Sequence, residues 1–411
     1  MNSVKKIELL APAGDLERLK IAVLYGADAI YLGGKQFSLR SRASNFSIED
    51  IAEGVKFAKA HGAHIHVTVN MLPHEEDMHG LKEYLMELER IGVTAIIAAS
   101  PAIMKCAKQY APKLEVHVST QHSSTNSSAA NYWKDKGMDR VVLARELTLD
   151  QIKETAKHAK VPLEVFIHGG MCISYSGRCV LSNHMTGRDA NRGGCAQSCR
   201  WKYRLYDGER QLHDDHDLFS MSSKDLMAAR FIPDLIEAGI ASLKIEGRMK
   251  SAYYIATLIK TYRMLIDEVY EKGCLNEARL QYYYEELSKA ENRPTAIGFY
   301  LGQPKPQDHL YGINGAGVTQ EYIAYVLDYD EKEQIATLEV RNHFLPHMEA
   351  EVFGPHIPMT KFMIEDLYDV DGNLVEVANK PMQILKMKSK LPMEKDAMIR
   401  KVMKKDRSDI Y

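Results

Sequence analysis

A short apolar strand pattern followed by a helical pattern recurs eight times within about the first 270 residues, and this repeat constrains the fold most. The strands are expected at residues 7–10, 29–32, 64–69, 95–98, 115–119, 140–143, 163–167 and 242–246. The helices are expected at residues 15–25, 48–61, 78–91, 102–110, 129–136, 149–159, 225–238 and 252–271. Eight strand-then-helix units predict an α/β fold, a (β/α)8 barrel of the TIM type. An open doubly wound sheet is the alternative, because no pattern shows whether the first strand pairs with the last.

The sequence pattern changes near residues 293–294. Glycine and proline are frequent from there to residue 317, and alternating apolar runs follow at 322–327, 336–340 and 351–353. Asp371-Gly372 predicts a hairpin turn. We therefore expect a barrel domain over residues 1–293 and a small all-β, barrel-like domain over residues 294–379. Residues 380–411 are expected to form a basic, partly helical tail, because residues 380–407 hold ten Lys or Arg against three Asp or Glu.

Composition narrows the class of protein. The formal net charge is −2, and 45% of the residues are hydrophobic, which is typical of a globular chain and excludes a mostly disordered one. No apolar run approaches the roughly 20 residues that cross a bilayer, and the first residues do not resemble an export signal. Six cysteines in a chain of 411 residues argue against a disulfide framework. We therefore expect a cytoplasmic protein with no membrane contact.

Four of the six cysteines lie in one long connection between expected strands, at residues 169–223. They are Cys172, Cys179, Cys195 and Cys199, spaced C-x6-C-x15-C-x3-C. Clustered thiolates in a reducing compartment bind zinc or iron–sulfur clusters. Only the last pair has the spacing of a zinc knuckle, so the pattern favours an iron–sulfur cluster. Zinc and redox-active or structural thiols are the alternatives.

The same segment is basic and aromatic. It holds Arg178, Arg188, Arg192, Arg200, Lys202 and Arg204, interleaved with Tyr175, Trp201 and Tyr203. Cationic and aromatic side chains together suit an unstacked RNA base and its phosphates. The alternative interpretation is that the arginines only balance the charge of a thiolate cluster.

Polar residues follow the expected strands at the end where barrel enzymes carry their chemistry. They are Asn70, Ser119, Gln121, Arg145, Glu146, His168, Glu246 and Arg248. Arg145 and Arg248 could bind a small dianion through a guanidinium fork, and His168 is a candidate acid or base. We expect His168, Glu146 and Arg145 to act in catalysis. Substrate contacts are expected from Gln121, Tyr175, Arg178, Arg192, Arg200 and Arg248.

Several sequence blocks resemble peptidase family U32, the collagenase-like peptidases. They are EVFIHGGMC at 164–172, SGRC at 176–179 and NRGGCAQSCR at 191–200, with LLAPAG at 9–14, STQ at 119–121 and LKIEGR at 243–248. The resemblance extends over essentially the whole chain. The length and layout of the chain are similar to those of the family's tRNA hydroxylases, which modify the wobble uridine.

The resemblance implies a function and a cofactor. It implies hydroxylation of the tRNA wobble uridine to 5-hydroxyuridine, with prephenate as the hydroxyl donor and a 4Fe-4S cluster bound to Cys172, Cys179, Cys195 and Cys199. Some relatives carry a further cysteine after Lys-Asp-Leu, where this chain has Met227, which leaves Cys199 as the fourth ligand. Two alternatives stay open: a collagenase-like peptidase, and a non-catalytic metal-bearing partner in RNA modification.

Overall fold

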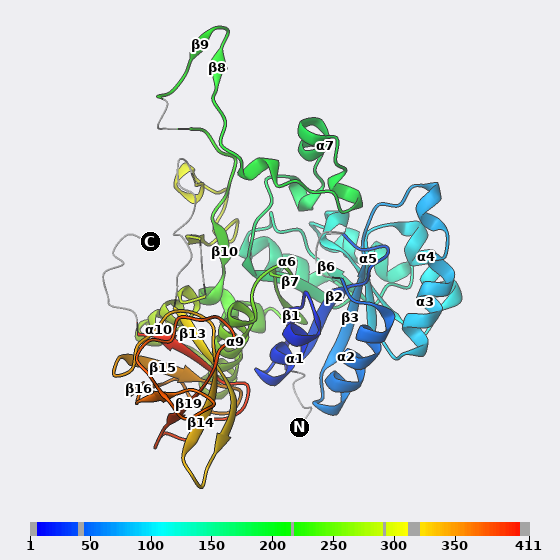
Figure 1. Ribbon diagram of the computed structural model, residues 1–411. Coiled ribbons are helices and arrows are strands. Elements are labelled where there is room, and N and C mark those ends of the chain that lie inside the picture. Colours follow the sequence, from blue (N-terminus) through cyan, green and yellow to red (C-terminus); the bar gives the residue numbers. More distant parts are fainter. Residues whose placement is uncertain (1–5, 40–44, 215–217, 291–292, 311–320, 403–411) are drawn as a thin grey trace.

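The computed structural model describes residues 6–39, 45–214, 218–290, 293–310 and 321–402. A closed barrel of eight parallel strands forms the larger part of it (Figure 1). The barrel strands are β1 (Glu8–Pro12), β2 (Ala29–Gly33), β3 (His64–Val69), β4 (Ala95–Ala98), β5 (Glu115–Val118), β6 (Arg140–Val142), β7 (Leu163–Gly169) and β11 (Ser242–Ile245). Each strand pairs with the next, and β11 pairs with both β7 and β1. This closure excludes the open sheet and confirms the predicted barrel.

Helices cover the outside of the barrel (Figure 1). They are α1 (Leu16–Leu24), α2 (Ile48–Ala60), α3 (Leu81–Arg90), α4 (Pro101–Tyr110), α5 (Ser127–Asp135), α6 (Leu149–His158), α8 (Ile232–Glu237) and α9 (Ala252–Lys272), followed by α10 (Glu277–Ser288). Local chemistry sets their ends. For example, Ser47 and Asp50 form a reciprocal capping box at the start of α2. None of the helices in the described ranges is long and apolar enough to span a membrane.

The expected helix at residues 225–238 is partly wrong. Residues Asp225–Met227 form a short strand, β10, which pairs antiparallel with the end of β7. A 3-10 turn, η6 (Ala229–Phe231), and α8 then follow. All three β10 side chains are buried, and a run of three buried residues is too short to distinguish a strand from a helix turn.

The chain between β7 and β10 stands above one end of the barrel (Figure 1). We call residues 170–223 the Cys loop. It contains η3 (Tyr175–Gly177), α7 (Leu181–Thr186), η4 (Ala190–Arg192), η5 (Ser198–Arg200) and a projecting hairpin of β8 (Tyr206–Asp207) and β9 (Arg210–Gln211). Leu226 of β10 pairs with Gly169 of β7, so the loop begins and ends at one point of the barrel wall.

The interior of the barrel carries charged side chains near the N-terminal ends of the strands. The Arg140 guanidinium bridges the Glu8 and Glu164 carboxylates, and the Lys244 ammonium lies 2.8 Å from Glu164. His66 and His117 lie in the same interior, with ring centres 4.9 Å apart. Glu164 and His117 are fully buried. Buried charges require such partners, because their desolvation is otherwise unfavourable.

The chain after residue 293 first returns to the barrel and then forms a separate sheet. β12 (Thr295–Ala296) pairs with β10. The second sheet consists of β13 (Tyr322–Asp330), β14 (Ile335–Val340), β15 (Glu349–Phe353), β16 (Thr360–Met363), β17 (Leu367–Tyr368), β18 (Leu374–Val375), β19 (Ile384–Lys388) and β20 (Met398–Lys401). β17 and β18 form the hairpin that Asp371-Gly372 predicted. Three of the frequent glycines in this region, Gly312, Gly315 and Gly317, lie outside the described residues.

The last segment differs from the expected helical tail, because β19 and β20 belong to this sheet. In β19, Leu385 and Met387 are buried while Lys386 and Lys388 are exposed. The count of basic residues concealed this alternation of period two. Arg400 in β20 is fully buried and paired with Glu286 of α10 and Glu351 of β15. Residues 403–411 of the expected tail lie outside the described residues.

Candidate active site

The predicted site residues gather at the C-terminal mouth of the barrel and in the Cys loop above it (Figure 1). Gln121 lies in η2 (Thr120–His122), directly after β5, whereas Arg145 and Glu146 follow β6. His168 lies near the end of β7, and Arg248 follows β11. Because the barrel strands are parallel, all these ends open on one face, as in TIM-barrel enzymes.

Arg248 crosses the mouth toward β3. One guanidinium nitrogen, Nη1, lies 3.1 Å from both Ser38 Oγ and Thr68 Oγ1, and Nη2 donates to the carbonyl of Leu39. A Cβ at Gly33 would lie 2.1 Å from Nη1, so the glycine makes room for the guanidinium. Arg248 is 5% exposed. Its charge is therefore held inside the mouth, and these groups hold it in place.

Gln121 is fixed by two donors at its carbonyl oxygen. Asn70 Nδ2 donates to Gln121 Oε1 over 2.9 Å, and Ser119 Oγ donates to the same oxygen over 3.1 Å. The backbone N–H of Leu39 donates to Asn70 Oδ1. These contacts link the ends of β3 and β5 across the intervening strand, β4.

His168 is buried in the wall of the mouth. Its Nδ1 lies 3.0 Å from the Tyr262 hydroxyl, and its ring packs edge-on against Tyr254 and Tyr262. The register of β7 against β11 shifts beside it, because Lys244 pairs with Phe166 and Ile245 pairs with His168. Such bulges redirect a side chain near many active sites. At 1% exposure, the His168 ring is enclosed against α9, which carries both tyrosines.

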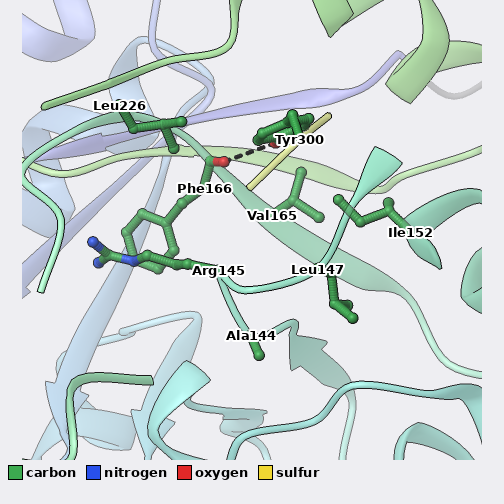
Figure 2. Close-up of a pocket in the computed structure, with 8 residues that line it drawn as sticks. All are labelled: Ala144, Arg145, Leu147, Ile152, Val165, Phe166, Leu226 and Tyr300. Carbon is green, nitrogen blue, oxygen red and sulfur yellow. Dashed lines mark hydrogen bonds between the residues drawn. The ribbon is translucent and has the colours of Figure 1, made fainter. Parts of the chain in front are cut away.

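Arg145 is held on the face of Phe166. The guanidinium carbon lies 3.7 Å from the ring centre, and Nη1 donates to the Gly170 carbonyl over 2.7 Å. Figure 2 shows the guanidinium pointing away from Leu147 and Ile152, which line a small pocket behind it. That pocket has a volume of about 10 Å³, enough for one water at most, so it is not a substrate site.

Three charged groups attach the Cys loop to the barrel rim. The Glu146 carboxylate accepts hydrogen bonds from the backbone N–H and the hydroxyl of Ser176, a residue in the left-handed region with φ 52°. The Arg192 guanidinium forms a bidentate pair with Asp77, at 2.9 and 2.8 Å. Arg145 holds the start of the loop through Gly170. Glu146 and Arg192, expected at the chemistry and the substrate, therefore position the loop in this structure.

The ionisation of Cys172 and of Cys199 is disfavoured by ionisation of their neighbouring cysteines in the Cys loop. Burial raises the pKa of Cys199, and the charges of Cys172, Cys195 and Cys179 raise it further, while the Arg200 guanidinium lowers it. Cys172 and Cys195 are exposed, and Cys179 is buried. In the part of the chain that the structure describes, no three or more His, Cys, Asp or Glu side chains lie close enough together to hold a metal ion.

The outer surface of the Cys loop exposes aromatic and basic side chains. Tyr175 is 54% exposed and Trp201 is 43% exposed. Arg178 is also exposed, whereas Arg200 lies inward, where a Cβ at Gly170 would be 3.2 Å from its guanidinium. Arg178 therefore lies on the surface of the loop, and Arg200 lies on its inner side beside Gly170.

Two contributors were missed in the sequence. Asp77 is given no role by the sequence analysis, and its partner Arg192 lies 115 residues away. Phe166 was read as a buried strand residue, although its ring supports Arg145. An ion pair between residues so far apart in the sequence leaves no local sequence pattern. Phe166, two residues before His168 at the end of a strand, is a weak signal in the sequence.

Residues 14–310 match peptidase family U32, and residues 318–400 match the peptidase family U32 C-terminal domain. The chain is 49% identical to "tRNA hydroxylation protein P1" of Bacillus subtilis, over 97% of this chain and 95% of that protein. It is 40% identical to "23S rRNA 5-hydroxycytidine C2501 synthase" of Escherichia coli, over 66% of this chain and 41% of that protein.

A third relative bears a different kind of name. The chain is 33% identical to "Collagenase" of Porphyromonas gingivalis, over 93% of this chain and 94% of that protein. The match to the family extends over both the barrel with its Cys loop and the second sheet. The chain belongs to peptidase family U32.

Proposed function

We propose that this chain is an RNA hydroxylase that converts the wobble uridine of tRNA to 5-hydroxyuridine. The observation that carries the proposal is the 49% identity, over nearly the full length of both chains, to a protein named for tRNA hydroxylation. The relative named as an rRNA 5-hydroxycytidine synthase supports the same reaction class, because it also hydroxylates a pyrimidine of RNA. A tRNA substrate would be met in the cytoplasm.

The Cys loop supports RNA as the partner. Exposed Tyr175 and Trp201 offer faces on which an unpaired base can stack, worth roughly 1–3 kcal/mol per base. Anticodon bases are already single-stranded, so little unstacking is required. Exposed Arg178 offers a charge for a phosphate. We expect RNA binding to weaken linearly in log Kd with log salt, as filter binding or anisotropy would measure.

The cofactor proposed is a 4Fe-4S cluster held by Cys172, Cys179, Cys195 and Cys199. The four cysteines lie in one loop and offer the sulfur ligands that such a cluster takes, and Arg200 follows Cys199 in the chain. A zinc ion would require its thiolate ligands to lie about 2.3 Å from one point, whereas a cluster is a larger object. When bound, such a cluster would supply or accept single electrons at the mouth. Glu146 and Arg192 would keep the loop in place around it.

The co-substrate proposed is prephenate, a small dianion. The mouth holds Arg145 and Arg248 on fixed supports, and a carboxylate is the group that a guanidinium binds best. His168, near the end of β7 and beside Tyr262, is the candidate to hold or move a proton there.

A complementation experiment tests this function. Cells that lack the gene, and any paralogue of it, are given wild-type, Cys172→Ala or Cys274→Ala protein, and wobble nucleosides are measured by mass spectrometry. Cys274 is an exposed cysteine outside the Cys loop and serves as the matched control. We expect wild type and Cys274→Ala to restore 5-hydroxyuridine derivatives, and Cys172→Ala to restore less than about a tenth. Unchanged nucleosides in the cells without the gene would contradict the proposal.

Peptide hydrolysis is the second candidate, because one relative is named a collagenase. The purified wild-type chain and Cys172→Ala are incubated with denatured collagen. Cleavage by the wild-type protein alone, with no change in tRNA nucleosides, would favour this candidate over hydroxylation.

A further inference from the structure

The loop after β5 contains an unusual group of polar atoms. Gln121 Nε2, His122 Nε2 and Ser124 Oγ are all buried and all lack a hydrogen-bond partner within the described ranges. Gln121 is only 4% exposed and Ser124 is 1% exposed. Buried polar groups almost always have partners, so three exceptions within four residues at the mouth of a barrel require an explanation. A ligand that supplies the missing partners is one.

The hydrogen-bond chain at the mouth fixes which way the Gln121 amide points. A backbone N–H can only donate, so the N–H of Leu39 requires the oxygen of Asn70 beside it. The Asn70 amide nitrogen then faces Gln121 and requires the oxygen of Gln121 in turn. Gln121 Nε2 is therefore turned away from Asn70 and left as a donor. The orientation follows from the backbone, not from a choice of side-chain flip.

The surroundings of this donor favour an anion. Burial lowers the pKa of His122, and the positive charge of Arg178 lowers it further. Arg178 is exposed on the Cys loop, where η3 packs on η2. The contact between η3 and η2 brings the segment before Arg178 against the loop that carries the fixed amide donor, and carboxylates bind well where a guanidinium and such a donor are both available. Apolar ligands gain nothing from either group.

Resting on the function proposed above, we infer that Gln121 Nε2 donates to a carboxylate oxygen of the small acid co-substrate. Asn70 acts as a positioning residue, because it sets the direction of the Gln121 amide without touching the ligand. Gln121 thus selects for an acceptor at this place in the mouth and rejects a donor.

Three substitutions test the inference by calorimetric titration of the full-length chain with prephenate. Gln121→Leu removes the donor, and Gln121→Glu replaces it with an acceptor that repels a carboxylate. In Asn70→Asp, one oxygen still accepts from Leu39, and the other forces the Gln121 amide to turn over. That variant keeps a hydrogen bond between residues 70 and 121, now donated by Gln121, gives up the donation from Ser119 Oγ, and presents an oxygen to the ligand. Gln151→Leu, on the outer helix α6, is the control.

We expect a Kd increase of about tenfold for Gln121→Leu and about a hundredfold for Gln121→Glu. Asn70→Asp should lie between them, with an unfolding temperature like that of wild type, and Gln151→Leu should bind normally. Binding of an anticodon stem-loop should change less than about twofold in Asn70→Asp. This separates a co-substrate contact from an RNA contact.

The other outcomes contradict either the assignment of Gln121 or the proposed co-substrate. Wild-type affinity for prephenate in Asn70→Asp and Gln121→Glu contradicts the assignment of Gln121 and leaves the proposed function standing. Loss of stem-loop binding with normal prephenate binding contradicts it as well and assigns the donor to RNA. Failure of the wild-type chain to bind prephenate contradicts the proposed co-substrate, and the Gln121 assignment falls with it.

Discussion

Single residues inside the barrel make the stability of the fold depend on pH. Burial raises the pKa of Glu164, but the charges of Lys244 and Arg140 outweigh it and lower the pKa to about 2. Because this value is below that of the unfolded chain, the ionised carboxylate stabilises the fold above about pH 4.5. That stability is lost as the pH falls toward 2. Glu164→Gln leaves Lys244 without its buried partner and should cost about 3–5 kcal/mol near pH 7.

Urea unfolding at several pH values checks this expectation. The wild-type free energy of unfolding should fall more steeply between about pH 5 and about pH 3 than that of Glu164→Gln, because the variant lacks the titrating group. Equal slopes would show that other carboxylates dominate the acid response. Glu154→Gln, on the exposed face of α6, is a suitable control.

At the scale of elements, the Cys loop depends on its attachment to η1 (Glu75–Met78), which contains Asp77. Asp77→Asn weakens the pair with Arg192 and should leave the barrel intact. Amide exchange over residues 188–199 is expected to become about two- to fivefold faster, with little change elsewhere. Glu87→Gln, which breaks the exposed pair with Arg90 on α3, is the matched control and should leave that segment unchanged. A loop that exchanges at the wild-type rate in Asp77→Asn would show that Arg192 does not hold it.

The elements also show what the sequence could predict and what it could not. Long buried strands such as β3 and β7 were predicted within one or two residues, because apolar runs and helical spacing alternate along the chain. β10 was missed because only three residues form it, and β19 because its exposed lysines outweighed its buried Leu385 and Met387. The site residues were brought to one mouth by parallel strands. Their partners were not predictable, since Asp77 meets Arg192 only through tertiary folding.

At the scale of the whole molecule, the barrel and the second sheet share a core. Phe353 and Met398 of the sheet pack in the barrel's hydrophobic cluster, and Tyr25 of the barrel donates to the carbonyl of Asp396. Arg400 lies in this interface, fully buried. Its removal in Arg400→Met leaves Glu286 and Glu351 buried and paired with Lys289, and should cost about 3–5 kcal/mol.

Scanning calorimetry measures the effect on both parts together. Wild type should unfold in one transition, and Arg400→Met should unfold at a lower temperature. Lys401→Met, one residue along the strand, should shift the midpoint by less than about 2 °C. An unchanged midpoint in Arg400→Met would mean that the buried charges of Arg400, Glu286 and Glu351 add nothing to the stability of the interface.

The position of the Cys loop has a consequence for how the molecule could be rebuilt. Its two ends meet at the pairing of Gly169 with Leu226, and the wall of the barrel closes through β7 and β11 without it. The barrel is therefore complete without the Cys loop. A chain in which a short glycine linker replaces the Cys loop should still fold into the barrel. The corresponding loops of other family members could then be inserted at this position, and their reactions compared on one common barrel.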